Sequence, residues 1–264
     1  MKVASFTASS DQPSRQDWPC AAWVERLSPA LPEIQVQVLA EVDSSNSELM
    51  RRARAGDLRA QLLVALAQSA GRGRMGRSWL SQPGDALTFS LGLPLQLRDW
   101  SGLSLAVGLS VAQSLHPQIE LKWPNDLWWR QRKLAGILIE TANVGAQRYA
   151  VIGIGINLKE RDAQGLSTAP AWLQEALPGV TAPQALSRVL GPLVQTLQRF
   201  ERDGFAAFRD GFNERDGLRE RSVTLSDGTQ GVARGVNESG ALLVHTAAGV
   251  QAVASSEVSV RPTP

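Results

Sequence analysis

The stretch Gln61–Trp79, QLLVALAQSAGRGRMGRSW, joins an apolar run of strand length to a loop that holds three glycines and three arginines. Residues 61–67 have the length and apolar composition of a buried strand. Glycine allows a ligand to approach the backbone closely, and arginine offers a planar, permanently charged fork to phosphate or carboxylate. The segment therefore predicts a strand that leads into an anion-binding loop.

The sequence that follows the loop indicates a folded domain. From Leu87 to Leu95, leucine and phenylalanine alternate with smaller residues, which is the period-two pattern of a strand. We expect the loop to connect two buried strands. Arginine–glycine runs also occur in RNA-binding tails, and a solvated basic loop would have the same composition, so the loop alone leaves those readings open.

The composition bounds the function. The chain has 264 residues, enough for one or two domains, and its 27 basic and 25 acidic residues nearly balance, so bulk attraction to nucleic acid is not indicated. A single cysteine excludes an intrachain disulfide, and no run has the length of a membrane span, so we expect a cytoplasmic protein. With only two histidines, chemistry should rest on Lys, Arg, Asp, Asn or Ser.

Polar residues mark the start of a helix before the loop. Ser45 and Glu48 have the spacing of a capping box, and the helix should end at Gly56. Ser44, Ser45 and Asn46 therefore stand where backbone N–H groups can meet a polar ligand, although capping alone would explain them equally well.

Charged residues mark a hairpin after the loop. The segment 122–127, KWPNDL, should turn at Asn125–Asp126 and return through a strand that Lys133 opens, which places Lys122, Asp126 and Lys133 at its base. The segment 101–115 is apolar nearly all round, as expected of a helix buried against a sheet.

The strand predicted for 151–158 has an unusual face. Gly153, Gly155 and Asn157 share one side of it, which leaves space rather than filling it. We expect a flat group against this face, with Asn157 reaching it; a tight helix–sheet contact is the alternative.

The two ends of the chain differ from its middle. Residues 1–40 are poorly patterned, with four prolines, and are too short for a winged-helix DNA reader. A helix should follow Thr181, which forms a capping box with Gln184. After Gly217, five short strand-like runs alternate with turns and suit a small antiparallel barrel.

Four separated motifs together resemble those of the biotin protein ligases. They are Asp43–Asn46 (DSSN), Gly71–Trp79 (GRGRMGRSW), Lys122–Ile137 with KWPNDL and RKLAGI, and Gly153–Asn157 (GIGIN). The resemblance implies an α+β fold, with a catalytic domain like that of the class II aminoacyl-tRNA synthetases: a mixed sheet with packed helices, followed by an SH3-like barrel. It implies an N-terminal extension over 1–40, a biotin- and ATP-binding domain over 41–216 and the barrel over 217–264.

The same resemblance implies the activity and the partners. The enzyme would join biotin to ATP as biotinyl-5'-AMP and pass biotin to a lysine of a biotin carboxyl carrier protein, with Mg²⁺ accompanying the nucleotide and its ligands unknown. We expect a monomer or homodimer, a short form without a DNA-binding domain, and no DNA or membrane partner.

Residue roles follow from the matched positions. Ser44, Ser45, Asn46 and Gln68 would bind the biotin head, and Arg72, Gly73 and Arg74 would hold carboxylate and phosphate. Lys133 would contact the activated carboxyl and the α-phosphate beside Gly136, Asp126 would lie near the second step, and Asn157 would line the nucleotide side. Lys133, Arg72 and Asp126 are thus the catalytic candidates.

Two positions and two rival functions remain open. Trp172 resembles a loop tryptophan that closes over adenine, although it could equally be a core anchor, and Leu80 stands where some relatives have an aromatic beside adenine. A lipoate or octanoate protein ligase would share the fold, and a non-enzymatic RNA-binding protein would explain the arginines alone.

Overall fold

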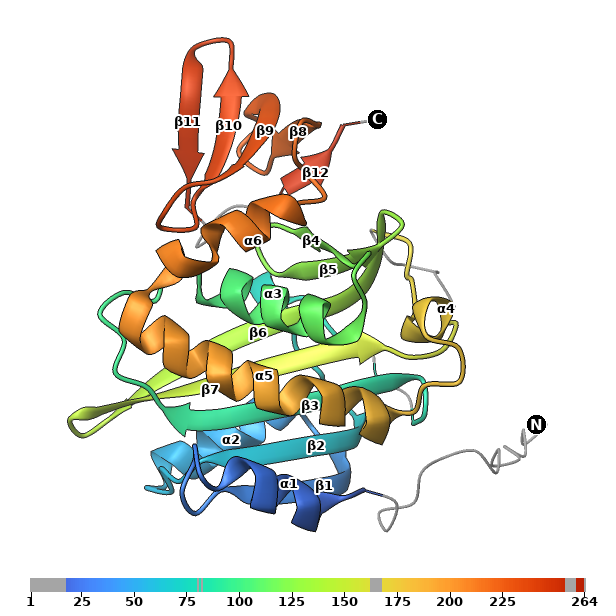
Figure 1. The fold of residues 1–264 in the computed structure, drawn as a ribbon, viewed down its shortest axis with the longest axis vertical. Coiled ribbons are helices and arrows are strands. Elements are labelled where there is room, and N and C mark those ends of the chain that lie inside the picture. The colour runs from blue at the N-terminus through green and yellow to red at the C-terminus, as the bar shows by residue number, and fades with distance from the viewer. Residues whose placement is uncertain (1–17, 80, 82, 162–167, 255–259, 264) are drawn as a thin grey trace, which may run out of the picture.

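Two β-sheets form the framework of the computed structural model, which describes residues 18–79, 81, 83–161, 168–254 and 260–263 (Figure 1). The larger sheet has seven strands in the order β1-β2-β3-β7-β6-β5-β4, and the smaller has five in the order β11-β10-β9-β8-β12. β1 and β2 pair in parallel, and the other neighbouring strands of the larger sheet pair antiparallel. The predicted mixed sheet is confirmed.

The strands of the larger sheet are β1 (Gln35–Val42), β2 (Gln61–Gln68), β3 (Ala86–Pro94), β4 (Glu120–Lys122), β5 (Asp126–Trp129), β6 (Arg132–Val144) and β7 (Gln147–Asn157). The helices are α1 (Cys20–Leu27), α2 (Ser45–Arg54), α3 (Leu103–Leu115), α4 (Leu173–Ala176), α5 (Ala182–Asp203) and α6 (Arg209–Glu214), with short 3₁₀ turns η2 (Arg74–Gly76) and η3 (Phe205–Phe208). None of the described helices has the length and hydropathy to cross a membrane.

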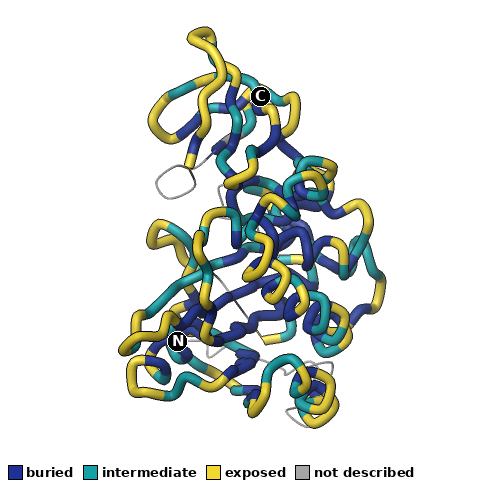
Figure 2. The backbone as a smooth tube through the Cα atoms, turned by 60° about the vertical axis from the view of Figure 1, so that its left-hand side comes forward, coloured by how far each residue is buried: buried dark blue, intermediate teal, exposed yellow. Residues whose placement is uncertain are grey.

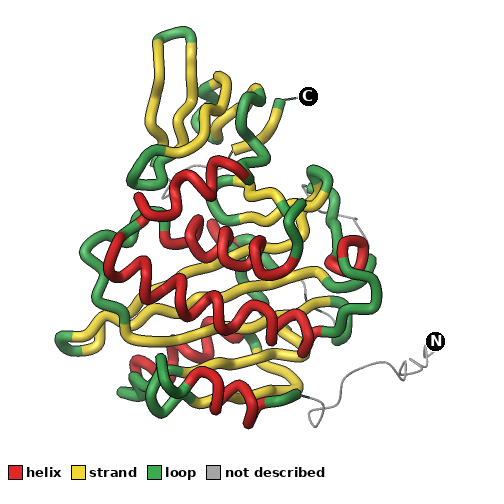
Figure 3. The backbone as a smooth tube through the Cα atoms, viewed as in Figure 1, coloured by secondary structure: helices red, strands yellow, loops and turns green. Residues whose placement is uncertain are grey.

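Helices cover both faces of this sheet. α3 and α5 lie in front of it in the view of Figures 1 and 3, and α2 lies behind it. The alternation along β2 explains the two layers, because Leu62 joins the main core under α3 and α5 whereas Leu63 joins a smaller cluster with Leu49 of α2. The central strands are buried along most of their length (Figure 2). α3 is buried nearly all round, as predicted.

The structure corrects the expected boundary at residue 40. β1 spans that point and pairs with β2, and Trp18, Trp23 and Leu27 are buried in the main core. The sequence showed no pattern here because α1 has only eight residues and because Val38 alone is buried in the edge strand β1. Residues from 18 onward therefore belong to the folded domain.

The smaller sheet confirms the antiparallel C-terminal β unit. Its strands are β8 (Ser222–Leu225), β9 (Gln230–Val236), β10 (Leu242–Thr246), β11 (Gly249–Val253) and β12 (Val260–Pro262). The fully buried Trp123, which precedes β5, donates its indole N–H to the carbonyl oxygen of Gly240 at 3.1 Å. This hydrogen bond joins the larger sheet to the C-terminal unit.

Candidate active site

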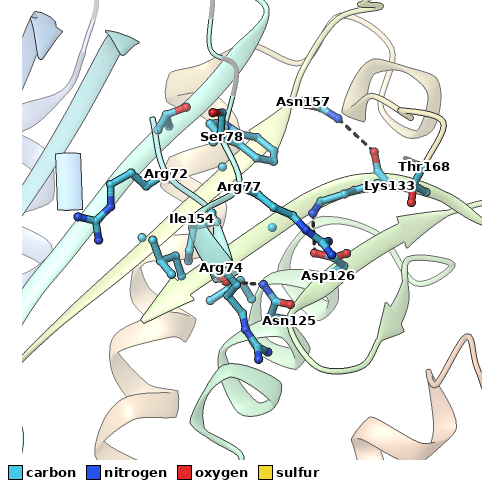
Figure 4. A pocket seen from close by; sticks show the side chains of 18 of the residues that line it. Arg72, Arg74, Arg77, Ser78, Asn125, Asp126, Lys133, Ile154, Asn157 and Thr168 are labelled. Atoms are coloured by element: carbon cyan, nitrogen blue, oxygen red, sulfur yellow. Dashed lines mark hydrogen bonds and ion pairs between the residues drawn. The ribbon is translucent and has the colours of Figure 1, made fainter. Parts of the chain in front are cut away.

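The four motifs meet around one cavity of about 780 Å³, a size suited to a cofactor-sized ligand. It is lined by these predicted site residues: Ser44, Ser45, Asn46, Gln68, Arg72, Gly73, Arg74, Asp126, Lys133, Gly136 and Asn157. Several of them are shown in Figure 4. Residues up to 113 positions apart are therefore brought together, from the start of α2, the loop after β2 and strands β5, β6 and β7.

The N-terminus of α2 forms the first wall. Ser44, not Ser45, is the N-cap, and its hydroxyl accepts a hydrogen bond from Ser47 N–H at 3.4 Å. Glu48 instead forms ion pairs with Arg51 and Arg52 in the next turn. The predicted capping box is wrong by one residue because two adjacent serines can both cap a helix.

Hydrogen bonds fix this wall from behind. Ser45 N–H donates to Gln68 Oε1 at 2.7 Å, which connects the helix entrance to the end of β2. Asn46 Nδ2 donates to the Leu138 carbonyl at 3.1 Å and to Glu140 Oε2 at 3.0 Å. All three motif residues 44–46 are only 3% exposed. The wall is thus a buried, hydrogen-bonded polar surface.

Two residues of this network were missed by sequence reasoning. Ser90 Oγ lies 2.6 Å from Asn46 Oδ1 and 2.8 Å from Ser45 Oγ, and Glu140 pairs with both Asn46 and Arg72. Ser90 fits the regular alternation of β3 and Glu140 is one of several polar residues in β6, so neither gave a distinct signal in the sequence.

The arginine–glycine loop folds back as a short hairpin. Gly73 N–H donates to the Arg77 carbonyl at 2.7 Å, and Arg72 pairs with Ser78 across the hairpin. A Cβ on Gly71 would lie 2.3 Å from the Trp79 carbonyl oxygen, so that position requires glycine. The turn itself uses left-handed backbone at Met75 (φ 54°) and Gly76 (φ 70°). Gly73 has φ −117°, so any need for glycine there comes from close approach and not from positive φ.

The arginines of the loop point in different directions. Arg72 forms an ion pair with Glu140 and donates to Ser47 Oγ at 3.3 Å, so its guanidinium lies away from Lys133 in Figure 4. Burial lowers the pKa of Arg74 from its usual value, with Asp126 acting in the opposite direction. Arg74 therefore adds positive charge to the wall near Asp126.

One carboxylate lies between two lysines, as predicted, but two hairpins hold them instead of one. β4 turns into β5 at 123–125 and β5 turns into β6 at 130–131, so the expected turn at Asn125–Asp126 is wrong, because Asp126 already pairs with Lys122 as the first residue of β5. Lys133 Nζ lies 2.7 Å from Asp126 Oδ1, and Lys122 Nζ lies 4.0 Å from Asp126 Oδ2. Burial lowers the pKa of Lys122; Asp126 opposes this, and Lys133, Arg77 and Arg74 add to the lowering. This end of the cavity concentrates positive charge around a single carboxylate.

The glycine face of β7 is occupied by side chains of the chain itself. A Cβ on Gly155 would lie 2.3 Å from the Trp79 ring, and a Cβ on Gly153 would lie 2.2 Å from Asn46 Oδ1. The expected flat group at Gly155 is thus the Trp79 indole. Its ring centroid lies 5.9 Å from Lys133 Nζ and 5.9 Å from Arg161 Cζ.

Asn157 fixes the backbone around Lys133. Its Nδ2 donates to the carbonyls of Lys133 at 3.1 Å and Ala171 at 2.9 Å, and its Oδ1 accepts from Arg161 Nη1 at 2.8 Å. Lys133 also exchanges backbone hydrogen bonds with Ala169 and Ala171. Asn157 reaches the cavity wall, but its amide groups are used within the protein.

Trp172 lies outside the set of described residues that line the cavity. Its ring is 5.4 Å from the guanidinium carbon of Arg132, which also forms an ion pair with Glu175 of α4. A role beside the nucleotide stays a prediction. Leu80, the position where some relatives have an aromatic residue beside adenine, lies outside the described residues. Over the described ranges, no group of three His, Cys, Asp or Glu side chains could hold a metal ion.

Comparison with known proteins agrees with this arrangement. Residues 40–157 match the biotin/lipoate A/B protein ligase family model, and residues 220–261 match the biotin protein ligase C terminal domain. The bifunctional ligase/repressor BirA of Salmonella typhimurium is 34% identical over 252 residues, which cover 90% of this chain and 78% of that protein. The biotin–[acetyl-CoA-carboxylase] ligase of Paracoccus denitrificans is 30% identical over 84% of this chain and 98% of its own length.

A solved structure shares the fold as well. The biotin protein ligase of Aquifex aeolicus in complex with biotin and ATP superposes with a TM-score of 0.74 and 29% identity over 87% of this chain and 99% of that chain. Both family models match this chain, and residues from the four sequence motifs line one cavity. The chain therefore belongs to the biotin protein ligase family.

Proposed function

We propose that the enzyme forms biotinyl-5'-AMP from biotin and ATP in this cavity and then transfers biotin to a lysine of a biotin carboxyl carrier protein. The observation that carries the proposal is the division of the cavity into a neutral, hydrogen-bonded wall at Ser45 and Asn46 and a cationic wall around Lys133. A ligand with an uncharged polar head and a carboxylate tail fits that division.

The first step would use the cationic wall. A carboxylate oxygen of biotin attacks the α-phosphorus of ATP, and the bond to the β-phosphate oxygen breaks to release pyrophosphate. This step brings two anions together, so catalysis is mostly positioning and fixed positive charge, and it needs no nucleophilic side chain. Lys133 and Arg74 line the cavity where such charge would be useful. Arg72 would have to leave Glu140 to contribute.

The second step would use the Lys133–Asp126 pair. The amine of the carrier lysine attacks the carbonyl carbon of the adenylate, AMP departs and the amine loses a proton. Asp126, 2.7 Å from Lys133, is the carboxylate placed to attract that amine and to accept the proton directly or through water. Gly136, the cross-strand partner of Asp126, leaves room beside the pair.

Magnesium would be held mainly by phosphate oxygens. The described residues hold no carboxylate cluster for it, and Mg²⁺ commonly combines one or two protein ligands with phosphates and water. Asp126 is the carboxylate on the cavity wall that could join such a set.

Pyrophosphate exchange into ATP tests the proposal. The full chain should catalyse exchange with biotin and not with lipoate, and should then label a biotin carboxyl carrier protein whose acceptor lysine is intact. A carrier with arginine in place of that lysine is the control. Exchange with lipoate alone would favour the lipoate ligase reading instead.

A further inference from the structure

A chain of hydrogen bonds passes behind the polar wall from β3 to β6. Ser90 Oγ lies 2.6 Å from Asn46 Oδ1, and the opposite side of the same amide donates to the Leu138 carbonyl and to Glu140. Ser90 is fully buried, and Asn46 is 3% exposed. Ser90 Oγ is also 2.8 Å from Ser45 Oγ.

The chemistry of these groups fixes the direction of each hydrogen bond. An amide oxygen can only accept, so the one proton of Ser90 goes to Asn46 Oδ1. Ser45 Oγ is a second acceptor for this same O–H group at 2.8 Å, so the two oxygens share the proton of Ser90. Both hydrogens of the Asn46 amide are taken by Leu138 and Glu140. Toward the cavity, Asn46 therefore offers lone pairs and no protons.

The opposite orientation of the Asn46 amide is blocked. A flipped amide would place its oxygen against a carbonyl and a carboxylate, which both can only accept, and its NH₂ group against Ser90. Gly153 lets the amide lie directly on β7, since a Cβ there would be 2.2 Å from Asn46 Oδ1. Arg72 pairs with Glu140 and holds the carboxylate in place.

We propose that Ser90 and Glu140 are positioning residues that set the hydrogen-bond polarity of this wall and so determine head-group specificity. They select a ring that presents N–H donors, such as the cyclic urea of biotin, over a ring without them, such as the dithiolane of lipoate. This inference rests on the proposed function and extends it to two residues that do not themselves carry the reaction.

The test compares biotin with an analogue in which one urea N–H is replaced by a ring oxygen. Ser90→Ala and Glu140→Met should each raise the KM for biotin about tenfold in pyrophosphate exchange, the loss expected when one buried hydrogen bond is removed. In Ser90→Ala the KM for ATP should stay within about twofold, because the hydrogen bonds of Ser90 go to Asn46 and Ser45 and not to the cationic wall. The preference for biotin over the analogue should shrink.

Two matched variants complete the design. Ser90→Thr keeps the hydroxyl and should retain the preference, and Ser110→Ala removes a buried hydroxyl from α3, away from the cavity, and should change neither KM. An unchanged preference in folded Ser90→Ala and Glu140→Met would overturn the inference, as would equal rises in both KM values of Ser90→Ala. If Ser90→Ala does not fold, the ligand preference of Glu140→Met decides. A wild-type chain that adenylates neither compound would contradict the proposed function itself.

Discussion

The polar end and the cationic end of the cavity differ in how far their side chains are buried and in how they are hydrogen-bonded. At the polar end, Ser45 and Asn46 are each 3% exposed and are hydrogen-bonded to neighbouring strands. At the cationic end, the side chains of Arg72 and Lys133 are 48% and 31% exposed, and burial lowers the pKa of Lys122. The polar end makes its hydrogen bonds within the protein, whereas the positive charges of the cationic end are stabilised when an anion binds.

The largest expected effect comes from breaking the cationic end. Lys133→Ala should reduce biotin-dependent pyrophosphate exchange about a hundredfold or more, since one fixed charge-stabilising donor contributes roughly 3 kcal/mol to a transition state. Lys159→Ala, just beyond β7, is the matched lysine control. Exchange near the wild-type rate in a folded Lys133→Ala protein would remove Lys133 from the catalytic set.

A next, smaller effect should come from crowding the polar end. Gly153→Ala should raise the KM for biotin and lower the Tm by several degrees, because overpacking costs about 1–3 kcal/mol and the Asn46 amide cannot easily move. Gly73→Val in the loop should weaken ligand binding with little change in Tm. Equal Tm losses in the two variants would contradict the contrast between a fixed wall and an adjustable loop.

Ligand binding should change the loop more than the wall. We expect saturating biotin and ATP to slow trypsin cleavage after Arg72, Arg74 and Arg77 at least about fivefold, since an anion that binds the folded loop opposes its opening. Cleavage after Arg219 in the exposed C-terminal region serves as the internal reference. Identical cleavage rates with and without ligands would mean that the loop is already as ordered as it becomes.

The smallest expected effect concerns pH. Burial lowers the pKa of Lys122 below its ordinary value of 10.5, so between the folded and unfolded pKa values the unfolded chain binds more protons and stability rises with pH. Lys122→Met should therefore raise the Tm by a few degrees near neutral pH, and this gain should shrink as pH rises through that window. A Tm of Lys122→Met below that of the wild type at neutral pH would show that the ion pair with Asp126 stabilises the fold by more than the burial of Lys122 costs.

The catalytic motifs and most strands could be predicted because their signals are local. The alternation along β3 and the uniformly apolar α3 each lie within one short stretch. The prediction that the four motifs line one site came from the family resemblance, because their spacing along the chain does not show that Ser45 and Lys133 lie in the same cavity. The hydrophobic periodicity alone would not have placed these two residues together.

The missed features depend on pairing between distant segments. Ser90 and Glu140 act through Asn46, which is 44 and 94 residues away from them. Trp79 fills the glycine face only because the loop turns back at Met75 and Gly76. α1 and β1 were overlooked because an eight-residue helix and an edge strand bury too few residues to produce a pattern.

The hydrogen bond from Trp123 to Gly240 has a consequence for how the molecule unfolds. Trp123 is buried in the main core, yet its indole N–H donates to the C-terminal unit, and Gly240 also packs closely on Gly102 at the start of α3. Detaching the small sheet would leave a buried donor without its acceptor. The two units should consequently melt as one cooperative block, with a single calorimetric transition whose van 't Hoff and calorimetric enthalpies agree.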